Sequence, residues 1–161
     1  MKGAFSPLGP CPETDERMAA RFILIQNRQG KTRLARYWVP LSEKQRKATR
    51  VDVHRAIATR DSKQVGNIVG FGDYVLVYRK YAGLYCTMCI EKTDNKMYFL
   101  EAIHLFIEVL DTFFGSVCEL DIVFHFGNVY AALDEMFLAG ELEETSKRAL
   151  LGRLEEFERL H

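Results

Sequence analysis

The order of two hydrophobic periodicities along this chain constrains its fold most strongly. Residues 21–91 hold short runs rich in β-branched and aromatic residues, separated by glycine-bearing turns. From Phe99 onward, apolar residues instead recur every three or four positions, as on the buried face of a helix. Strand and helix patterns are largely segregated, which indicates an α+β fold built in layers and argues against a doubly wound nucleotide-binding fold.

Five segments are expected to form strands. The run "RFILIQN", residues 21–27, is typical of a central strand buried on both faces, and "TRLARYWV", residues 32–39, is its expected antiparallel partner. The other three are "NIVGF", "YVLVYRKYA" and "LYCTMCIEK". Between the second and third strands, Ser42-x-x-Gln45 matches a capping box and predicts a helix to about Arg60. Its weakly apolar face, which places it on the outside of the molecule, consists of Ala48, Val51 and Ile57.

Further helices are expected after the strands. The first has an apolar stripe over residues 99–114 and ends at Gly115. The second starts at another capping box, Ser116-x-x-Glu119, and ends at Gly140 as its C-terminal cap. Its expected buried stripe consists of Ile122, Val123, Phe126, Val129, Tyr130, Leu133 and Phe137.

The chain has the length of one domain. It has 161 residues, of which 48% are hydrophobic, so it can bury a core. A last helix is expected over about residues 145–160, which gives the element order ββαβββααα. Residues 1–17 contain three of the four prolines and no periodicity, so we expect a flexible N-terminal extension before a domain of residues 18–161.

Charge and cysteine content argue against several classes of protein. The 22 basic side chains balance 22 acidic ones, which gives no general support for binding nucleic acid or an anionic membrane. No stretch approaches 18 uncharged apolar residues, so no membrane span is predicted, and the start lacks the apolar segment of a signal peptide. The four cysteines show no convincing disulfide spacing and are typical of a reduced, cytosolic protein.

The triplet Gly30-Lys31-Thr32 matches the end of a phosphate-binding P-loop. A P-loop also needs a glycine five positions before this one, but that position is Ile25. The loop must further lead into a helix, whereas "TRLARYWV" has a strand pattern. We therefore expect a hairpin turn. Around it lie four cations, for which a solvated edge and a binding role both stay open: Arg28, Lys31, Arg33 and Arg36.

The sequence shows little that would support catalysis or metal binding. Cys86 and Cys89 form a CxxC, but residues three apart in a strand face opposite sides of the sheet, so we interpret both as small core residues. No histidine follows a metal-binding spacing, and no serine lies in a GxSxG motif. We expect neither a cofactor nor an enzymatic activity. The polar face of the helix over residues 99–114, more typical of a solvated surface than of an ion site, consists of Glu101, His104, Glu108 and Asp111.

Five longer segments stand out as a set: "RFILIQNRQGKTRLARYW", "YRKYAGLY", "LEAIH", "FGSVCELDIVF" and "DEMFLAGE". In this order they resemble the small, or sigma, chain of clathrin adaptor complexes, over the chain from about Met18 to the last helix. "ILIQNR", "YAGLY", "LEAIH" and "DEMFLAGE" look most like the plasma-membrane, or endocytic, adaptor. "WVPLS" and "FGSVCELDI" look more like the Golgi and endosomal adaptor, so both assignments stay open, with the endocytic one favoured.

The resemblance implies a longin-like (SNARE-like) domain, a five-stranded antiparallel sheet flanked by helices, in agreement with the predicted order. It implies a non-catalytic subunit of a heterotetramer with two large chains, alpha-type and beta-type, and one mu-type medium chain. Such a subunit binds acidic dileucine signals, [D/E]xxxL[L/I], in the cytosolic tails of membrane cargo. It would lie at the cytoplasmic face of the plasma membrane in clathrin-coated pits, or in the cytosol when unrecruited. It would reach membrane and clathrin coat through its partner chains and bind no nucleic acid.

Matched position by position, the resemblance assigns seven residues to the signal site. Arg33, in the "GKTRL" match, would hold the acidic residue four positions before the first leucine. Ser116 replaces the asparagine usual in animal endocytic sigma chains and keeps a small polar group at the pocket rim. Ile107 replaces the usual valine and makes the pocket slightly shallower. The leucine pockets would be formed by Ala82, Leu84, Ile107, Val117 and Ile122.

Two other interpretations are kept as alternatives. Another longin-like coat subunit, such as the small chain of coatomer, would have a structural role and no signal pocket. A nucleotide-binding enzyme is suggested by the GKT triplet alone. The weakly apolar first helix and the high aromatic content further indicate that the isolated chain exposes surface meant for a large chain.

Overall fold

A single large sheet forms the centre of the structure. The computed structural model describes residues 19–61 and 67–160, so the extension expected over residues 1–17 lies outside the described residues. Five strands form one antiparallel sheet in the order β2-β1-β5-β4-β3. The prediction of five strands is confirmed. Their bounds are β1 (Phe22–Asn27), β2 (Thr32–Tyr37), β3 (Ile68–Phe71), β4 (Tyr74–Tyr81) and β5 (Leu84–Glu91).

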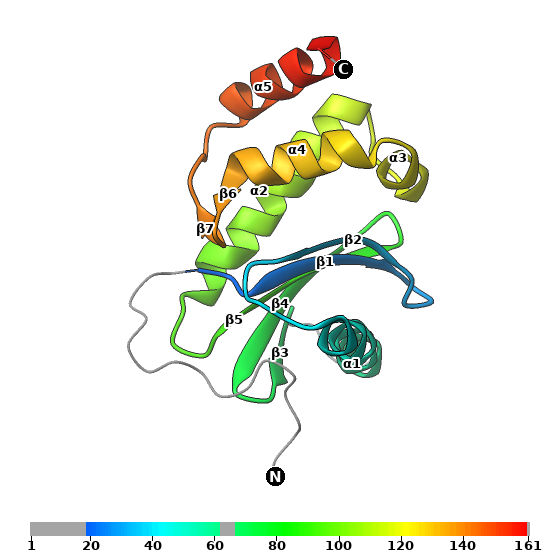
Figure 1. Ribbon diagram of the computed structural model, residues 1–161, viewed down its shortest axis with the longest axis vertical. Helices are drawn as coiled ribbons and strands as arrows, with labels where there is room; N and C mark the ends of the chain where they lie inside the picture. The colour runs from blue at the N-terminus through cyan, green and yellow to red at the C-terminus, as the bar shows by residue number, and fades with distance from the viewer. Residues whose placement is uncertain (1–18, 62–66, 161) are drawn as a thin grey trace.

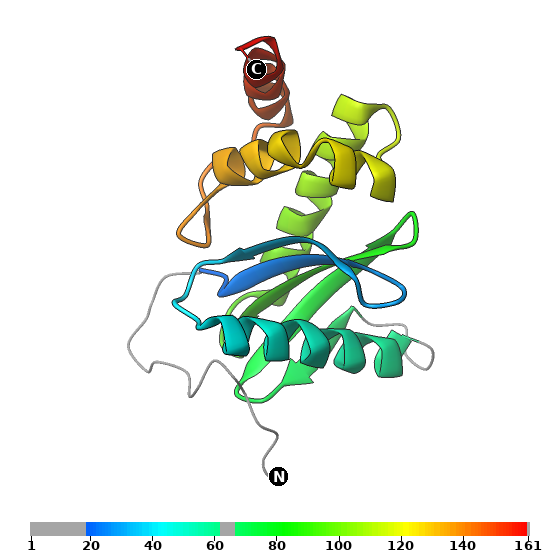
Figure 2. The same cartoon turned by 45° about the vertical axis from the view of Figure 1, so that its right-hand side comes forward.

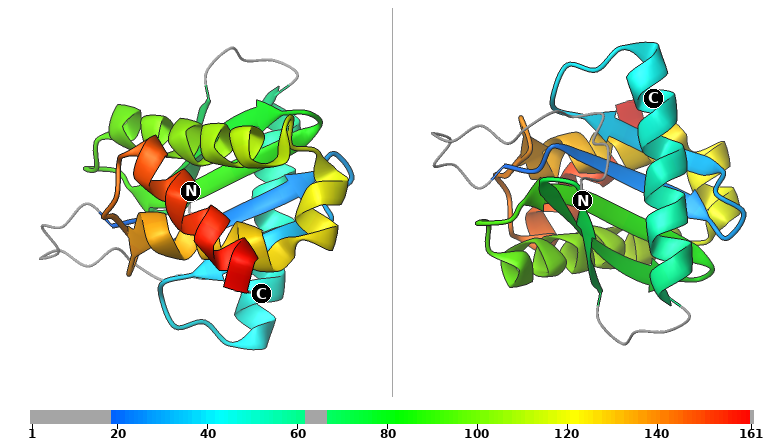
Figure 3. Two further views of the ribbon diagram at one scale, coloured as in Figure 1. Left: turned by 90° about the horizontal axis from the view of Figure 1, so that it is seen from above. Right: turned by 90° about the horizontal axis from the view of Figure 1, so that it is seen from below.

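Helices cover both faces of this sheet (Figures 1 and 2). Helix α1 (Glu43–Asp61) lies across one face, while α2 (Lys96–Phe114) and α4 (Phe126–Met136) cover the other. Helix α5 (Lys147–Leu160) packs on α2 and α4 in an outer layer, and the view from above shows it lying between them (Figure 3). The arrangement confirms the predicted α+β layers.

Strand β1 explains the continuous apolar run near the start of the described chain. It lies between β2 and β5, and all six of its residues are buried. Because successive side chains of a strand alternate, Ile23 and Ile25 belong to the core on the side of α2. Phe22 and Leu24 belong to the core on the side of α1. A strand enclosed in this way needs apolar residues at every position, as the sequence predicted.

Helix α1 forms the outer layer that was expected, but only one of the three predicted apolar residues, Ile57, is fully buried. Val53 and Ile57 are buried, whereas Val51, part of the expected apolar face, is 48% exposed. Two residues four positions apart lie on one side of a helix, and this pair, together with the half-buried Ala56, gives α1 its apolar contact with the sheet. The capping box at its start is present: Gln45 N donates to Ser42 Oγ at 3.2 Å, and Ser42 N donates to Gln45 Oε1 at 2.8 Å.

The single helix expected after Gly115 is in fact two. Helix α3 (Glu119–Phe124) and helix α4 are separated at His125, whose φ of −122° and ψ of 41° are not helical. The break interrupts the 3.6-residue period on which the predicted stripe depended. Two members of that stripe, Val123 and Phe126, are therefore 38% and 62% exposed.

The start of α3 also differs from the prediction. Cys118 N donates to Asp121 Oδ2 at 3.0 Å, so the helix begins after Cys118 and the predicted Ser116–Glu119 box does not form. Ser116 instead has a positive φ of 81° in the loop before the helix. Glu119 becomes the first residue of α3, which leaves its side chain available for a contact outside the helix.

A small hairpin replaces the helix cap expected at Gly140. Strand β6 (Phe137–Leu138) pairs with β7 (Glu141–Leu142) as a second, two-stranded sheet. The linking residues Ala139 and Gly140 have φ values of 51° and 86°, both positive, as a type I′ turn requires. Ala20 N donates to Gly140 O at 2.8 Å, which ties this hairpin to the segment that leads into β1.

Candidate functional site

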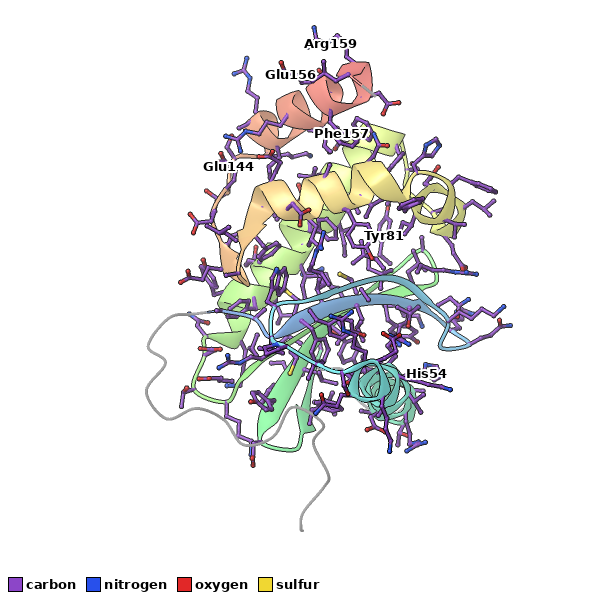
Figure 4. The ribbon with its side chains drawn as sticks, viewed as in Figure 1. His54, Tyr81, Glu144, Glu156, Phe157 and Arg159 are labelled. Atoms are coloured by element: carbon purple, nitrogen blue, oxygen red, sulfur yellow. The ribbon has the colours of Figure 1, made fainter. Side chains whose placement is uncertain are left out.

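The GKT triplet lies in the turn between β1 and β2. Asn27 Oδ1 accepts hydrogen bonds from Gln29 N at 2.9 Å and Lys31 N at 3.0 Å, which closes the turn. Gly30 has a φ of 87°, and a Cβ at this position would lie 2.7 Å from Cδ2 of His54 on α1, labelled in Figure 4. Glycine is therefore required by the backbone and by the approach of α1. The expected hairpin turn is confirmed, and a P-loop, which leads into a helix, is excluded.

Four of the seven expected site residues line one cavity between the sheet and the helices. They are Leu84 of β5, Ile107 of α2, Val117 in the loop after α2, and Ile122 of α3. Leu84, Val117 and Ile122 are at most 5% exposed, while Ile107 is half-buried. The fold thus joins four distant parts of the sequence in one apolar wall. The rest of the lining consists of Ile25, Arg79, Tyr81, Cys86 and Leu110.

The cavity is small, and one of its lining residues has a buried, unpaired polar atom. Its volume is about 20 Å³, space for roughly one water molecule. A leucine side chain is several times larger, so it could enter only after the lining side chains had moved apart. Arg79 Nε is buried and has no hydrogen-bond partner within residues 19–61 and 67–160. Nε of Arg36 and Nε of Arg46 are buried and unpaired within the same ranges, so this atom alone does not mark a ligand site.

Ala82 and Ser116 do not line the cavity but lie directly beside residues that do. Ala82 and Gly83 form the turn between β4 and β5, with φ values of 51° and 79°, again as in a type I′ turn. Ala82 and Ser116 are both exposed. They precede Leu84 by two residues and Val117 by one, so they are neighbours of lining residues in the sequence.

Asp111 on α2 connects two sides of the cavity. Its Oδ1 accepts a hydrogen bond from the hydroxyl of Tyr81 at 2.5 Å and another from Val117 N at 3.0 Å. The hydrogen bond to Asp111 raises the pKa of Tyr81, because a nearby carboxylate favours the protonated phenol. Figure 4 shows Tyr81 between the sheet and the helix layer. Sequence analysis missed this role, since the helical period placed Asp111 on the solvated face.

Arg33 on β2 is paired with Glu119 on α3. Its Nε lies 2.6 Å from Glu119 Oε2, and the same oxygen accepts from Asn27 Nδ2 at 3.1 Å. The two side chains of the ion pair are 30% and 33% exposed. The hydrogen bonds from Arg33 and Asn27 lower the pKa of Glu119, so it is ionised at neutral pH. Arg33 does not line the apolar cavity, but its partner lies between the two lining residues Val117 and Ile122 in the sequence.

The remaining cations of the hairpin do not act as one patch. Arg36 pairs with Asp134 of α4 at 2.9 Å, and its guanidinium lies 4.9 Å from the centre of the Tyr130 ring. Arg28 and Lys31 are exposed and make no ion pair with any residue of the described ranges. The solvated-edge interpretation therefore fits these two, whereas Arg33 and Arg36 have specific contacts.

The CxxC cysteines lie on opposite faces of β5, as interpreted from their spacing. Cys86 belongs to the core under α2 and Cys89 to the core under α1. Burial raises the pKa of the Cys86 thiol to about 12, which makes it a poor nucleophile. Residues 19–61 and 67–160 contain no cluster of three or more histidine, cysteine, aspartate or glutamate side chains suited to a metal. In the same ranges, no helix has both the length and the apolar character needed to cross a bilayer.

Comparisons with known proteins agree with this architecture. The family model described as clathrin adaptor complex small chain matches residues 19–161. A chain in a homology model of the full-length AP-3 complex in a stretched open conformation has a TM-score of 0.70. It is 23% identical, covers 88% of this chain and is itself covered to 94%, which supports the fold alone.

Curated relatives are more similar in sequence. The AP-2 complex subunit sigma of Gibberella zeae is 58% identical over 139 residues, which cover 86% of this chain and 97% of the relative. The AP-2 complex subunit sigma of Dictyostelium discoideum is 52% identical over 83% of this chain and 94% of the relative. The AP-1 complex subunit sigma-2 of the same organism is 40% identical over 83% and 86%. From the family match and these identities, the chain belongs to the family of clathrin adaptor complex small chains.

Proposed function

We propose that this chain is the small subunit of the heterotetrameric clathrin adaptor that acts in endocytosis at the plasma membrane. The support is its greater identity to AP-2 sigma subunits, 58% and 52%, than to an AP-1 sigma subunit, 40%. Its partners would be an alpha-type and a beta-type large chain and a mu-type medium chain, through which it reaches membrane and clathrin. Its family consists of adaptor subunits, so the chain has no enzymatic role.

The identity of the co-purifying large chain tests this assignment. An alpha-type large chain is the expected partner. A gamma-type chain would instead indicate the Golgi and endosomal adaptor, and coatomer chains would indicate a coat subunit without a signal site.

We further propose that the cavity and Arg33 together bind acidic dileucine signals in cargo tails. The observation that carries this proposal is an apolar cavity lined by Leu84, Ile107, Val117 and Ile122. Arg33 is paired with Glu119, on the same helix as Ile122. The cavity would take the leucine side chains once its wall opens.

Magnitudes assign different tasks to the two parts of the site. Burying a leucine side chain contributes roughly 1.5–3 kcal/mol, so two leucines supply much of a micromolar affinity of about −8 kcal/mol. A partly exposed ion pair such as that of Arg33 contributes only about 0.2–1 kcal/mol. The leucines would therefore provide most of the affinity, and Arg33 would set the register of the peptide and its selectivity for an acid.

Replacing Ile107 with aspartate tests the signal site. We expect Ile107→Asp to abolish binding of a dileucine peptide to the assembled complex, because a charged carboxylate would occupy the entrance of an apolar cavity. Fluorescence anisotropy of a labelled peptide measures this. Met97→Asp, on the same helix at a residue 63% exposed, is the matched control and should bind normally. Full binding by an intact complex carrying Ile107→Asp would rule out the site.

A further inference from the structure

Glu119 already occupies the arginine that the acidic residue of a signal would need. Its Oε2 lies 2.6 Å from Arg33 Nε and 3.1 Å from Asn27 Nδ2, so a single carboxylate oxygen receives both donors. The terminal guanidinium nitrogens of Arg33 make no hydrogen bond within residues 19–61 and 67–160. The guanidinium of Arg33 is therefore only partly hydrogen-bonded before a ligand arrives. Its Nε is paired with Glu119, whereas its terminal nitrogens have no partner among the described residues.

We infer that Glu119 is an internal competitor that lowers the affinity of Arg33 for the acidic residue of a signal. The inference rests on the proposed function, because it concerns the same site. A signal carboxylate must either displace Glu119 from Arg33 or bind beside it. Displacement breaks an existing ion pair, and binding beside it places two like charges on one guanidinium, so both arrangements weaken binding. Glu119 thus determines how much the acidic residue of a signal adds to the affinity of that signal for the site.

The position of Glu119 also couples this competition to the cavity. Glu119 is the first residue of α3, two residues after Val117 and three before Ile122, both of which line the cavity. Its pairing with Arg33 and Asn27 fastens the start of α3 to the β1–β2 hairpin. An acid that takes Arg33 away from Glu119 leaves only the hydrogen bond from Asn27 and so weakens the attachment of a wall that must move before a leucine can enter.

The variant Glu119→Gln separates the charge of this side chain from its structural contacts. The amide oxygen of glutamine can still accept hydrogen bonds from Arg33 and Asn27, so the attachment of α3 is kept. The negative charge, and with it the competition, is removed. A purely structural role for Glu119 would therefore leave selectivity for the acid unchanged in this variant.

The experiment uses the assembled adaptor complex and two peptides, one with a glutamate four positions before the first leucine and one with alanine there. We expect Glu119→Gln to raise the affinity for the glutamate peptide about two- to fivefold, the range of a partly exposed charge interaction. The affinity for the alanine peptide should not change. Isothermal titration calorimetry measures both constants, and the gain should shrink at high salt, because salt screens exposed charges.

Asp134→Asn is the matched control. It removes the carboxylate that pairs with Arg36, which lies on the same strand as Arg33, and it should change neither binding constant. An unchanged or reduced affinity of Glu119→Gln for the glutamate peptide, with normal binding by the unmodified complex, overturns the inference and leaves the proposed function intact. Failure of the unmodified complex to bind either peptide overturns the proposed function, and this inference with it.

Discussion

A single oxygen of Asp111 links three parts of the chain that enclose the cavity. It accepts from the Tyr81 hydroxyl at the end of β4 and from Val117 N in the loop after α2, while Asp111 itself belongs to α2. Its backbone carbonyl also accepts from Ser116 N at 2.9 Å, at the C-terminal end of the helix. Ser116 and the lining residue Val117 are therefore both positioned by this one residue.

We expect Asp111→Ala to lower the free energy of unfolding by about 1–3 kcal/mol, because the buried Val117 N–H loses its partner. Asp111→Asn retains an acceptor oxygen at the same place and should cost clearly less. Urea unfolding followed by circular dichroism measures both variants, with Asp134→Asn at an exposed carboxylate as a control. An equal loss for the alanine and asparagine variants would show that the charge of Asp111, and not its acceptor oxygen, matters.

The residues that sequence analysis missed have partners far away in the chain. Four of the lining residues, Leu84, Ile107, Val117 and Ile122, were assigned to the site through the resemblance to the family. Asp111 could not be identified in this way, because the helical period grouped it with solvated residues, and only the loop that follows α2 turns Val117 back towards it. Glu119 was assigned to a capping box, whereas its partner Arg33 lies 86 residues earlier. Such long-range pairs leave no local pattern.

At the scale of elements, two of the differences from prediction have separate causes. The stripe from Ile122 to Phe137 continues with helical spacing across the break at His125, and no proline marks the interruption, so periodicity alone predicts one helix. Gly140 was expected to end that helix. Glycine with positive φ serves both a helix cap and a type I′ hairpin, and a two-residue strand is too short to show an alternating pattern.

Gly140→Ala should destabilise the protein more than Gly83→Ala. Both glycines have a similar positive φ, 86° and 79°, so an alanine at either carries strain of about 1–2 kcal/mol. At Gly140 the new Cβ would also lie 2.2 Å from the backbone oxygen of Ala20, whereas nothing lies within 4 Å of it at Gly83. Thermal unfolding of the two variants isolates the cost of pushing the β6–β7 hairpin away. Equal losses of stability in the two variants would show that the hairpin moves away from Ala20 at little energetic cost.

At the scale of the whole molecule, the layered architecture followed from the sequence because sheet and helix periodicities are set by burial, and each layer imposes its own period. The location of the exposed apolar surface did not follow. It was expected from the weak face of α1, yet the structure concentrates it at the junction of α3 and α4. The exposed residues there are Leu120, Val123, Phe124 and Phe126.

We expect this junction to make the isolated chain self-associate, because exposed aromatic residues gathered in one segment favour contact with another apolar surface. The double variant Phe124→Ser, Phe126→Ser should raise the concentration at which aggregates appear, as measured by light scattering. Leu160→Ser, at a residue 75% exposed on α5, is the control and should have little effect. Unchanged scattering in the double variant, with the fold intact, would place the association elsewhere.

The small volume of the cavity has a consequence for the speed of recognition. If leucines can enter only a widened form, the observed association rate would level off at high peptide concentration, at the rate at which the wall opens, instead of rising in proportion. The measured affinity would fall below the intrinsic one by the fraction of molecules that are open at any moment. Two cargo tails that make identical contacts would then bind at different rates only if they stay near the closed subunit for different lengths of time.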